Sequence, residues 1–201
     1  MKNWMYISLA ALILTGCSQN HDQIESATKK VPVTQATSTF TLSPLPVTEG
    51  KEKFATLANQ QIGAVQLKGT LKATHWLKGV EYLPDKQERV LFSMELEPKK
   101  YDTTIRFSQS FSDDLIQFGI DVGDTVLFGD DTFTHLDDYI VRGADFRSKT
   151  ATATPYNLLM VYHLSKNKEM RGFNLNEVTR PADVPLKKGE RIFGIVLSNQ
   201  K

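Results

Sequence analysis

The chain has 201 residues, of which 24 are Lys or Arg, 23 are Asp or Glu, and one, Cys17, is a cysteine. This length suits one ordinary domain with an extension rather than two large domains. The balanced charge argues against nucleic acid as a partner, because phosphate binding requires a clear surplus of basic residues. A single cysteine excludes an intramolecular disulfide and a cysteine-rich zinc site.

The N-terminal segment begins with Lys2 and continues with an apolar run, Met5–Leu14, that only Ser8 interrupts. The run is too short to cross a bilayer, which requires about 20 residues. Its length and its position behind a basic residue are typical of the hydrophobic region of a secretory signal peptide.

The residues Leu14-Thr15-Gly16-Cys17 follow this run directly. They resemble the lipobox of bacterial lipoproteins, in which a Leu and two small residues precede a Cys, and the resemblance covers residues 1–20 only. It implies that residues 1–16 are a signal peptide, that the thiol of Cys17 carries a diacylglycerol, and that the new amino group is usually acylated. The alternative is an ordinary secretory signal in which the cysteine occurs by chance.

The residue after the cysteine bears on localisation. In lipoproteins of diderm bacteria, an Asp in that place retains the protein in the inner membrane, whereas this chain has Ser18. The resemblance therefore implies a lipid anchor in the cell envelope, at the outer membrane if the organism is a diderm.

Residues 17–48 lack hydrophobic periodicity. Between Val31 and Thr48, seven of eighteen residues are Ser or Thr and three are Pro. Such a composition buries too little apolar surface to offset its ordering entropy, so we expect a flexible tether. The alternative is an arm that lies along the folded body, with Phe40 and Leu42 docked. The following residues, 49–62, carry apolar side chains at helical spacing and predict a short helix.

Residues 63–201 are expected to form a β-rich domain, because apolar and polar residues alternate with period 2 in several runs. Two later runs, Leu158–Leu164 and Ile192–Leu197, are apolar at both parities and suit central strands that are covered on both faces. Leu115–Ile120 fits a strand or a short helix equally well. The residues expected to face inward in the alternating runs are Val65, Leu67, Leu71 and Ala73; Val90, Phe92, Met94 and Leu96; and Ile105, Phe107 and Phe111.

Turn-forming residues separate these runs. The fold class they predict is mainly β: a compact antiparallel barrel or sandwich with one or two short helices, of undetermined strand order and closure. The predicted turns are Leu83-Pro84-Asp85, Val122-Gly123-Asp124, Phe128-Gly129-Asp130 and Lys188-Gly189-Glu190.

Charge is unevenly distributed along the chain. Residues 101–146 hold ten acids, all Asp, and two bases, whereas residues 147–201 hold ten bases and four acids. One interpretation is that Asp forms turns here and that the acidic loops lie beside the basic C-terminal strands as weak surface pairs. The other is an acidic patch for partner docking or cation binding.

The acidic residues are densest between positions 130 and 138, where Asp130, Asp131, His135, Asp137 and Asp138 offer carboxylate oxygens and one imidazole. Such a set is a candidate site for a hard cation, or for zinc through His135. The spacing does not match a calcium-binding EF-hand loop. We therefore predict an exposed loop without a catalytic metal, and no cofactor.

No catalytic motif of the common hydrolase or nucleotide-binding classes occurs in the chain. His75, Trp76 and Tyr82 form a candidate ligand pocket, since aromatic side chains with one polar group are typical of ligand sites. The competing interpretation, which we favour, is that His75 is a hydrogen-bonded core or rim residue and that Trp76 fills the core. The leading hypothesis is a non-enzymatic, lipid-anchored envelope protein whose β-domain binds a protein, an envelope polymer or a small ligand. The alternative is an envelope hydrolase or metal-dependent enzyme that uses His75 or His135 with a nearby Asp.

Overall fold

The fold was analysed in a computed structural model. The chain divides into two units, Met1–Thr34 and Gln35–Lys201, and all of the described residues belong to the second. The predicted signal peptide, Cys17 and Ser18 lie outside the described residues. The structure describes residues 37–46, 60–112, 115–132, 136–167 and 174–201.

The first sheet contains six strands in the order β7-β6-β5-β2-β1-β9, and all neighbouring strands are antiparallel. Strands β5, β6 and β7 form a meander, and β2 lies between β1 and β5. Their bounds are Thr39–Pro44 for β1, Gln60–Thr70 for β2, Lys100–Ser112 for β5, Leu115–Val122 for β6, Thr125–Thr132 for β7 and Ala151–Thr152 for β9.

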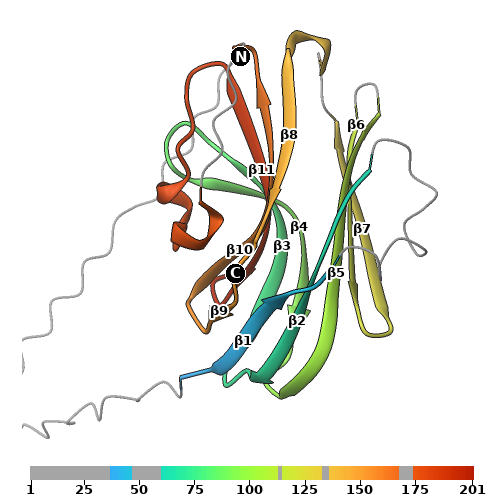
Figure 1. The fold of residues 1–201 in the computed structure, drawn as a ribbon, viewed down its shortest axis with the longest axis vertical. Helices are drawn as coiled ribbons and strands as arrows, with labels where there is room; N and C mark the ends of the chain where they lie inside the picture. The colour runs from blue at the N-terminus through green and yellow to red at the C-terminus, as the bar shows by residue number, and fades with distance from the viewer. Residues whose placement is uncertain (1–36, 47–59, 113–114, 133–135, 168–173) are drawn as a thin grey trace, which may run out of the picture. The chain divides into compact units, whose positions relative to one another are not determined.

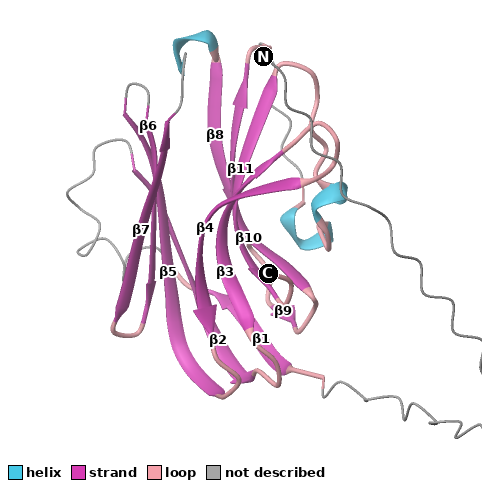
Figure 2. Ribbon diagram, turned by 180° about the vertical axis from the view of Figure 1, so that it is seen from behind, coloured by secondary structure: helices cyan, strands magenta, loops and turns pink. Residues whose placement is uncertain are grey.

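The second sheet contains five strands in the order β4-β3-β11-β10-β8, again with antiparallel neighbours throughout. Figures 1 and 2 show this sheet lying face to face with the first. The chain passes from one sheet to the other after β2, β4, β7, β8 and β9. The bounds are His75–Tyr82 for β3, Glu88–Leu96 for β4, Val141–Phe146 for β8, Tyr156–Ser165 for β10 and Glu190–Ser198 for β11.

The expected fold class is confirmed: the described chain is mainly β, with two antiparallel sheets arranged as a sandwich. The described residues contain no α-helix, and their helical segments are the 3-10 turns η2 (Leu136–Asp138), η3 (Leu175–Glu177) and η4 (Pro181–Asp183). None of the described segments is a helix long and apolar enough to cross a membrane.

Strands β10 and β11 occupy the centre of the second sheet, as their apolar sequences predicted. Every residue of β10 is buried, and so are the last seven residues of β11. One face of these strands packs into the core between the sheets, where Phe193 lies near Phe118 of β6. The other face packs against Leu175 and Val184, which belong to the segment that carries η3 and η4. Both faces of β10 and β11 are therefore shielded from solvent.

The predicted tether over residues 17–48 is wrong for its last part, because Thr39–Pro44 forms β1 and pairs with β2 along its whole length. Phe40 is 4% exposed and Leu42 is fully buried. The alternative of an arm docked by these two side chains is thus correct for β1. Period-2 burial of two large side chains outweighs the turn-prone composition around them. Residues 17–36 and 47–48 lie outside the described part.

Two other local predictions can be compared with the structure. The predicted helix over residues 49–62 lies outside the described residues, except for Gln60, Gln61 and Ile62, which belong to β2. Leu115–Ile120 is extended and belongs to β6, so the strand alternative is correct. The predicted turn at Gly123 joins β6 to β7 as a two-residue hairpin loop, with Gly123 at a φ of +62°. Glycine reaches this conformation without strain, unlike other residues.

Strand β4 departs from the predicted alternation. Gly79 of β3 pairs with Phe92 and Val80 pairs with Val90, so Leu91 is an extra residue on β4. Such a β-bulge reverses the inside-outside pattern beyond it. Val90 is accordingly 44% exposed, whereas Leu91 packs against the core. Ala73, also expected to face inward, is exposed in the connection from β2 to β3.

The predicted turn Phe128-Gly129-Asp130 is wrong, because all three residues lie within β7 and Gly129 pairs with Phe118. Gly129 is required for packing and does not form a turn. A Cβ atom at Gly129 would lie 2.7 Å from Cδ1 of Phe92, which reaches across from β4. A Cβ at Gly79 would overlap the same ring. Phe92 therefore fits where two strands of different sheets both lack a side chain.

We predict that Gly79→Ala destabilises the protein by about 1–3 kcal/mol, because the new methyl group forces the Phe92 ring out of its position. Denaturant unfolding of Gly79→Ala, with Ser93→Ala on the exposed side of β4 as control, measures this cost. In a Phe92→Leu background the same glycine substitution should cost clearly less. Equal costs in the two backgrounds would contradict the packing argument.

Candidate functional site

The three residues predicted to line one pocket are separated by the structure. His75 begins β3 and packs edge-on against the Phe40 ring, with the centroids 5.5 Å apart. Trp76 points to the opposite face, because successive strand residues alternate. Tyr82 lies at the far end of β3, about 20 Å from Trp76 along an extended strand. The prediction of a shared pocket is therefore wrong, but His75 does line a pocket of its own.

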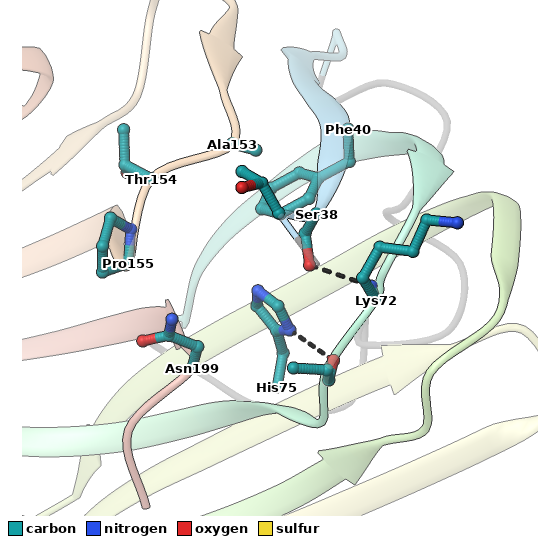
Figure 3. Close-up of a pocket in the computed structure, with 10 residues that line it drawn as sticks. Ser38, Phe40, Lys72, His75, Ala153, Thr154, Pro155 and Asn199 are labelled. Carbon is teal, nitrogen blue, oxygen red and sulfur yellow. Dashed lines mark hydrogen bonds between the residues drawn. The ribbon is translucent and has the colours of Figure 1, made fainter. Parts of the chain in front are cut away.

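The His75 pocket has a volume of about 370 Å³ and opens where the chain crosses between the sheets. One wall is the connection from β2 to β3, and another is the connection from β9 to β10. The start of β1 and the residue after β11 complete it. Figure 3 shows these side chains around His75. The lining residues are Thr37, Ser38, Phe40, Lys72, Ala73, His75, Ala153, Thr154, Pro155 and Asn199.

A backbone carbonyl fixes the orientation of the His75 ring. Nδ1 lies 2.8 Å from the carbonyl oxygen of Ala73, and this oxygen can only accept. Nδ1 is therefore the donor, which in the neutral ring leaves Nε2 as an acceptor. Figure 3 shows this second nitrogen directed into the pocket, between Ser38 and Pro155. His75 is only 2% exposed, and Nε2, which has no hydrogen-bond partner among the described residues, faces the pocket (Figure 3).

Hydrogen bonds hold the walls of the pocket in place. The Ser38 hydroxyl accepts from the backbone N–H of Lys72 at 2.9 Å, so its own proton remains free to donate. Thr154 Oγ1 lies 2.8 Å from Asn157 Oδ1, and the Asn157 amide donates back to the Thr154 carbonyl at 2.9 Å. The N–H of Asn199 donates to the carbonyl of Pro155 at 3.1 Å. The pocket is thus largely preformed.

The interior of the pocket carries little charge. None of the described residues that line it is an Asp or a Glu. Lys72 lines the pocket, but its ammonium group extends away from His75 (Figure 3). A hydrolase built on a His normally orients that ring with a carboxylate, which also stabilises the imidazolium. The Ala73 carbonyl orients His75 but brings no negative charge.

His163 is not among the described residues that line this pocket. His163, in β10, points toward Glu190, with Nε2 and Oε2 3.5 Å apart and both side chains at most 5% exposed. This pair lies on the face of the second sheet that points away from the first sheet, beside Ile192. His135 lies outside the described residues.

The Asp-rich segment is exposed where its side chains are described. Asp130 lies near the end of β7, and Asp137 and Asp138 belong to η2; all three are exposed. Asp138 forms an ion pair with Lys166 at 2.8 Å, which joins the acidic and basic parts of the chain at the surface. His135 and the side chain of Asp131 lie outside the described part, and within that part no three His, Cys, Asp or Glu residues cluster as metal ligands.

Sequence reasoning missed a buried polar network on the outer face of the second sheet. Lys78 forms an ion pair with Glu88 across β3 and β4. The Tyr156 hydroxyl donates to the other Glu88 oxygen at 2.9 Å, and the Tyr82 and Tyr156 hydroxyls lie 2.7 Å apart. The sequence signal that could have revealed it was Lys78. This charged residue lies two positions before Val80, so both side chains share one face of β3. Burial raises the pKa of both tyrosines, and nearby Glu88 adds to this effect.

The buried carboxylate of Glu81 ties three neighbouring strands together. Glu81 of β3, 6% exposed, accepts from Arg89 of β4 at 2.6 Å and from Arg191 of β11 at 2.7 Å. The Arg191 guanidinium also lies 5.0 Å from the Phe193 ring centroid. Both oxygens of the carboxylate are occupied, so this group supports the sheet and offers no free catalytic acid.

No family model, curated protein or solved structure matches this chain.

The tyrosine pair predicts a loss of stability at alkaline pH. Tyrosines in the unfolded chain ionise near their ordinary pKa of about 10, whereas folded Tyr82 and Tyr156 keep their protons above that pH. The free energy of unfolding should therefore fall as the pH rises above about 10. In Tyr156→Phe this slope should be shallower by up to about 1.4 kcal/mol per pH unit.

At neutral pH the same variant should lose about 1–3 kcal/mol, because Glu88 and Tyr82 lose a buried partner. Urea unfolding of wild type, Tyr156→Phe and Tyr82→Phe between neutral pH and about pH 11 measures both effects. An identical alkaline slope in all three proteins would contradict the raised tyrosine pKa values.

Proposed function

We propose that this chain is a lipid-anchored cell-envelope protein whose β-sandwich is a non-enzymatic binding module. The anchor is a diacylglycerol on Cys17, and Ser18 directs the protein to the outer membrane of a diderm. Support for the anchor comes from the Leu14-Thr15-Gly16-Cys17 sequence directly behind an apolar run. The partners are then the membrane, through the lipid, and an envelope component, and they do not include nucleic acid.

The observation that carries the binding role is the His75 pocket. Its walls are held by hydrogen bonds within the protein, and the buried imidazole of His75 presents Nε2 to the pocket (Figure 3). Concave sites with apolar walls and a few placed polar groups are the usual form of small-molecule and side-chain binding sites. Preformed walls reduce the ordering entropy that a ligand must overcome.

The enzyme alternative is less well supported, because the described geometry does not supply its parts. His75 lacks a carboxylate partner, and the described pocket residues contain no acid. His163 faces Glu190 on the other side of the sheet, away from the pocket. A binding module needs neither a general base nor a nucleophile, and the arrangement around His75 suits it better.

Replacement of Cys17 with Ser tests the anchor. The variant lacks the thiol that would carry the diacylglycerol, so it should not incorporate a fatty-acid analogue and should remain uncleaved at residue 17. The sandwich should still fold, because the described strands begin at Thr39 and no disulfide involves Cys17. Metabolic labelling and the mass of the mature N-terminus are the measurements. A wild-type chain without label and with a different N-terminus would refute the lipid anchor.

The binding role is tested in the native envelope. A photo-cross-linking amino acid in place of Asn199, at the pocket rim, should capture one defined envelope component, identified by mass spectrometry. The same amino acid in place of Asp124, in the exposed β6–β7 loop, serves as the control. When His75→Leu is added to the Asn199-substituted protein, capture should decrease about five- to tenfold, as expected for the loss of one hydrogen bond. Equal capture from both positions, unchanged by His75→Leu, would contradict a binding role for this pocket.

A further inference from the structure

We infer that the His75 pocket takes a neutral, hydroxyl-rich ligand of the size of a sugar ring. This inference rests on the proposed binding role and names the class of ligand for the same site. The ligand could be a free saccharide or the terminal unit of an envelope glycan, since both present the same ring and the same hydroxyl groups.

The hydrogen-bonding groups in the pocket suit a ligand that can both donate and accept hydrogen bonds. His75 Nε2 accepts, because Nδ1 is committed to the carbonyl of Ala73. The Ser38 hydroxyl donates, because its oxygen already accepts from Lys72 N–H. The Thr37 hydroxyl, beside Ser38, can do either. A sugar hydroxyl satisfies both demands, since one O–H donates a proton and accepts through its lone pairs.

The lack of internal charge argues against an ionic ligand. A carboxylate or ammonium group transferred from water into a site without a counter-charge loses several kcal/mol of hydration. The described lining residues include no acid that would hold a cation. Lys72 is the one lysine among them, and its ammonium extends away from His75 in Figure 3. A neutral ligand avoids this cost.

The apolar part of the lining suits the carbon faces of a sugar ring. Phe40, Ala73, Ala153 and Pro155 supply non-polar surface around the polar groups. Sugar rings carry C–H groups on their faces and hydroxyls at their rims, so a ring can contact non-polar walls while its rim reaches His75 and Ser38. The volume of about 370 Å³ lies at the lower end of the range of small-molecule sites.

The test uses the protein purified in detergent from cells that express the full chain. The probes are four neutral monosaccharides, glucose, galactose, mannose and N-acetylglucosamine, together with glucuronate, the carboxylate counterpart of glucose. The readouts are the ¹⁵N resonance of the His75 imidazole, which reports directly on a hydrogen bond at Nε2, and calorimetric titration, which measures sugar affinity in the variants that lack His75. A soluble tetrasaccharide of N-acetylglucosamine then distinguishes a glycan from a free sugar.

We expect saturable shifts of the His75 Nε2 resonance with at least one neutral sugar, and binding of glucuronate at least tenfold weaker than that of glucose. His75→Leu should weaken binding of the neutral sugar about five- to tenfold, whereas His75→Gln, whose amide oxygen accepts, should restore part of the affinity. Asp124→Asn, outside the pocket, should have no effect. Tighter binding of the tetrasaccharide than of the single sugar would indicate a glycan, and equal binding would indicate a free saccharide.

The unfavourable outcomes separate this inference from the proposed function. Tighter binding of glucuronate than of every neutral sugar would overturn the ligand class but leave the pocket a binding site. No response of His75 to any neutral sugar, combined with specific cross-linking from the Asn199 position, would refute the inference alone. Loss of both the sugar response and the cross-linking would refute the binding role as well. Thermal unfolding of each variant shows whether a weakened response reflects the pocket or a failure to fold.

Discussion

Strands β10 and β11 run side by side through the middle of the second sheet, and both of their faces are sealed from water. On the inner face, Phe193 meets the first sheet through Phe118. On the outer face, Leu158 and Ile192 lie beneath the segment that carries η3 and η4. Burial of each large apolar side chain contributes about 1.5–3 kcal/mol, so the inward-facing residues of this central pair contribute strongly to the contact between the two layers. The neighbouring strands β3 and β8 are placed by pairing with it.

The His75 pocket follows from this arrangement. Strand β3 is held beside β11, so His75 comes to lie near Asn199, the residue that follows β11. The chain enters β10 from the first sheet through Ala153–Pro155, which forms another wall. Strand β1 adds Phe40 from the opposite layer. The pocket therefore lies where the chain passes between the sheets. Connections between strands, rather than hydrogen-bonded strands, surround much of this space.

Three polar residues of the second sheet differ in how fully other residues occupy their polar atoms. Glu81 and Glu88 each accept from two side chains, so their charges serve to tie adjacent strands together. His75 differs, because one nitrogen is held by the Ala73 carbonyl and the other is left to the pocket. A buried polar group that the fold orients, but whose hydrogen-bonding capacity it does not fully satisfy, is suited to bind a ligand.

Period-2 alternation and the two doubly apolar runs predicted the fold class from the sequence alone, because side-chain burial in a sheet follows local parity. The same local signals failed where burial depended on another strand. Thr39–Pro44 looked like a tether, Gly129 looked like a turn, and Val90 looked buried until the bulge at Leu91 turned it outward. His75 stood out as a polar residue at a strand position, but its companions did not. Ser38 and Asn199 lie far from it in the chain, and only the pairing of distant strands brings them together. Local sequence determines which face of a strand is apolar, whereas long-range packing decides what that face, or a gap beside it, will contact.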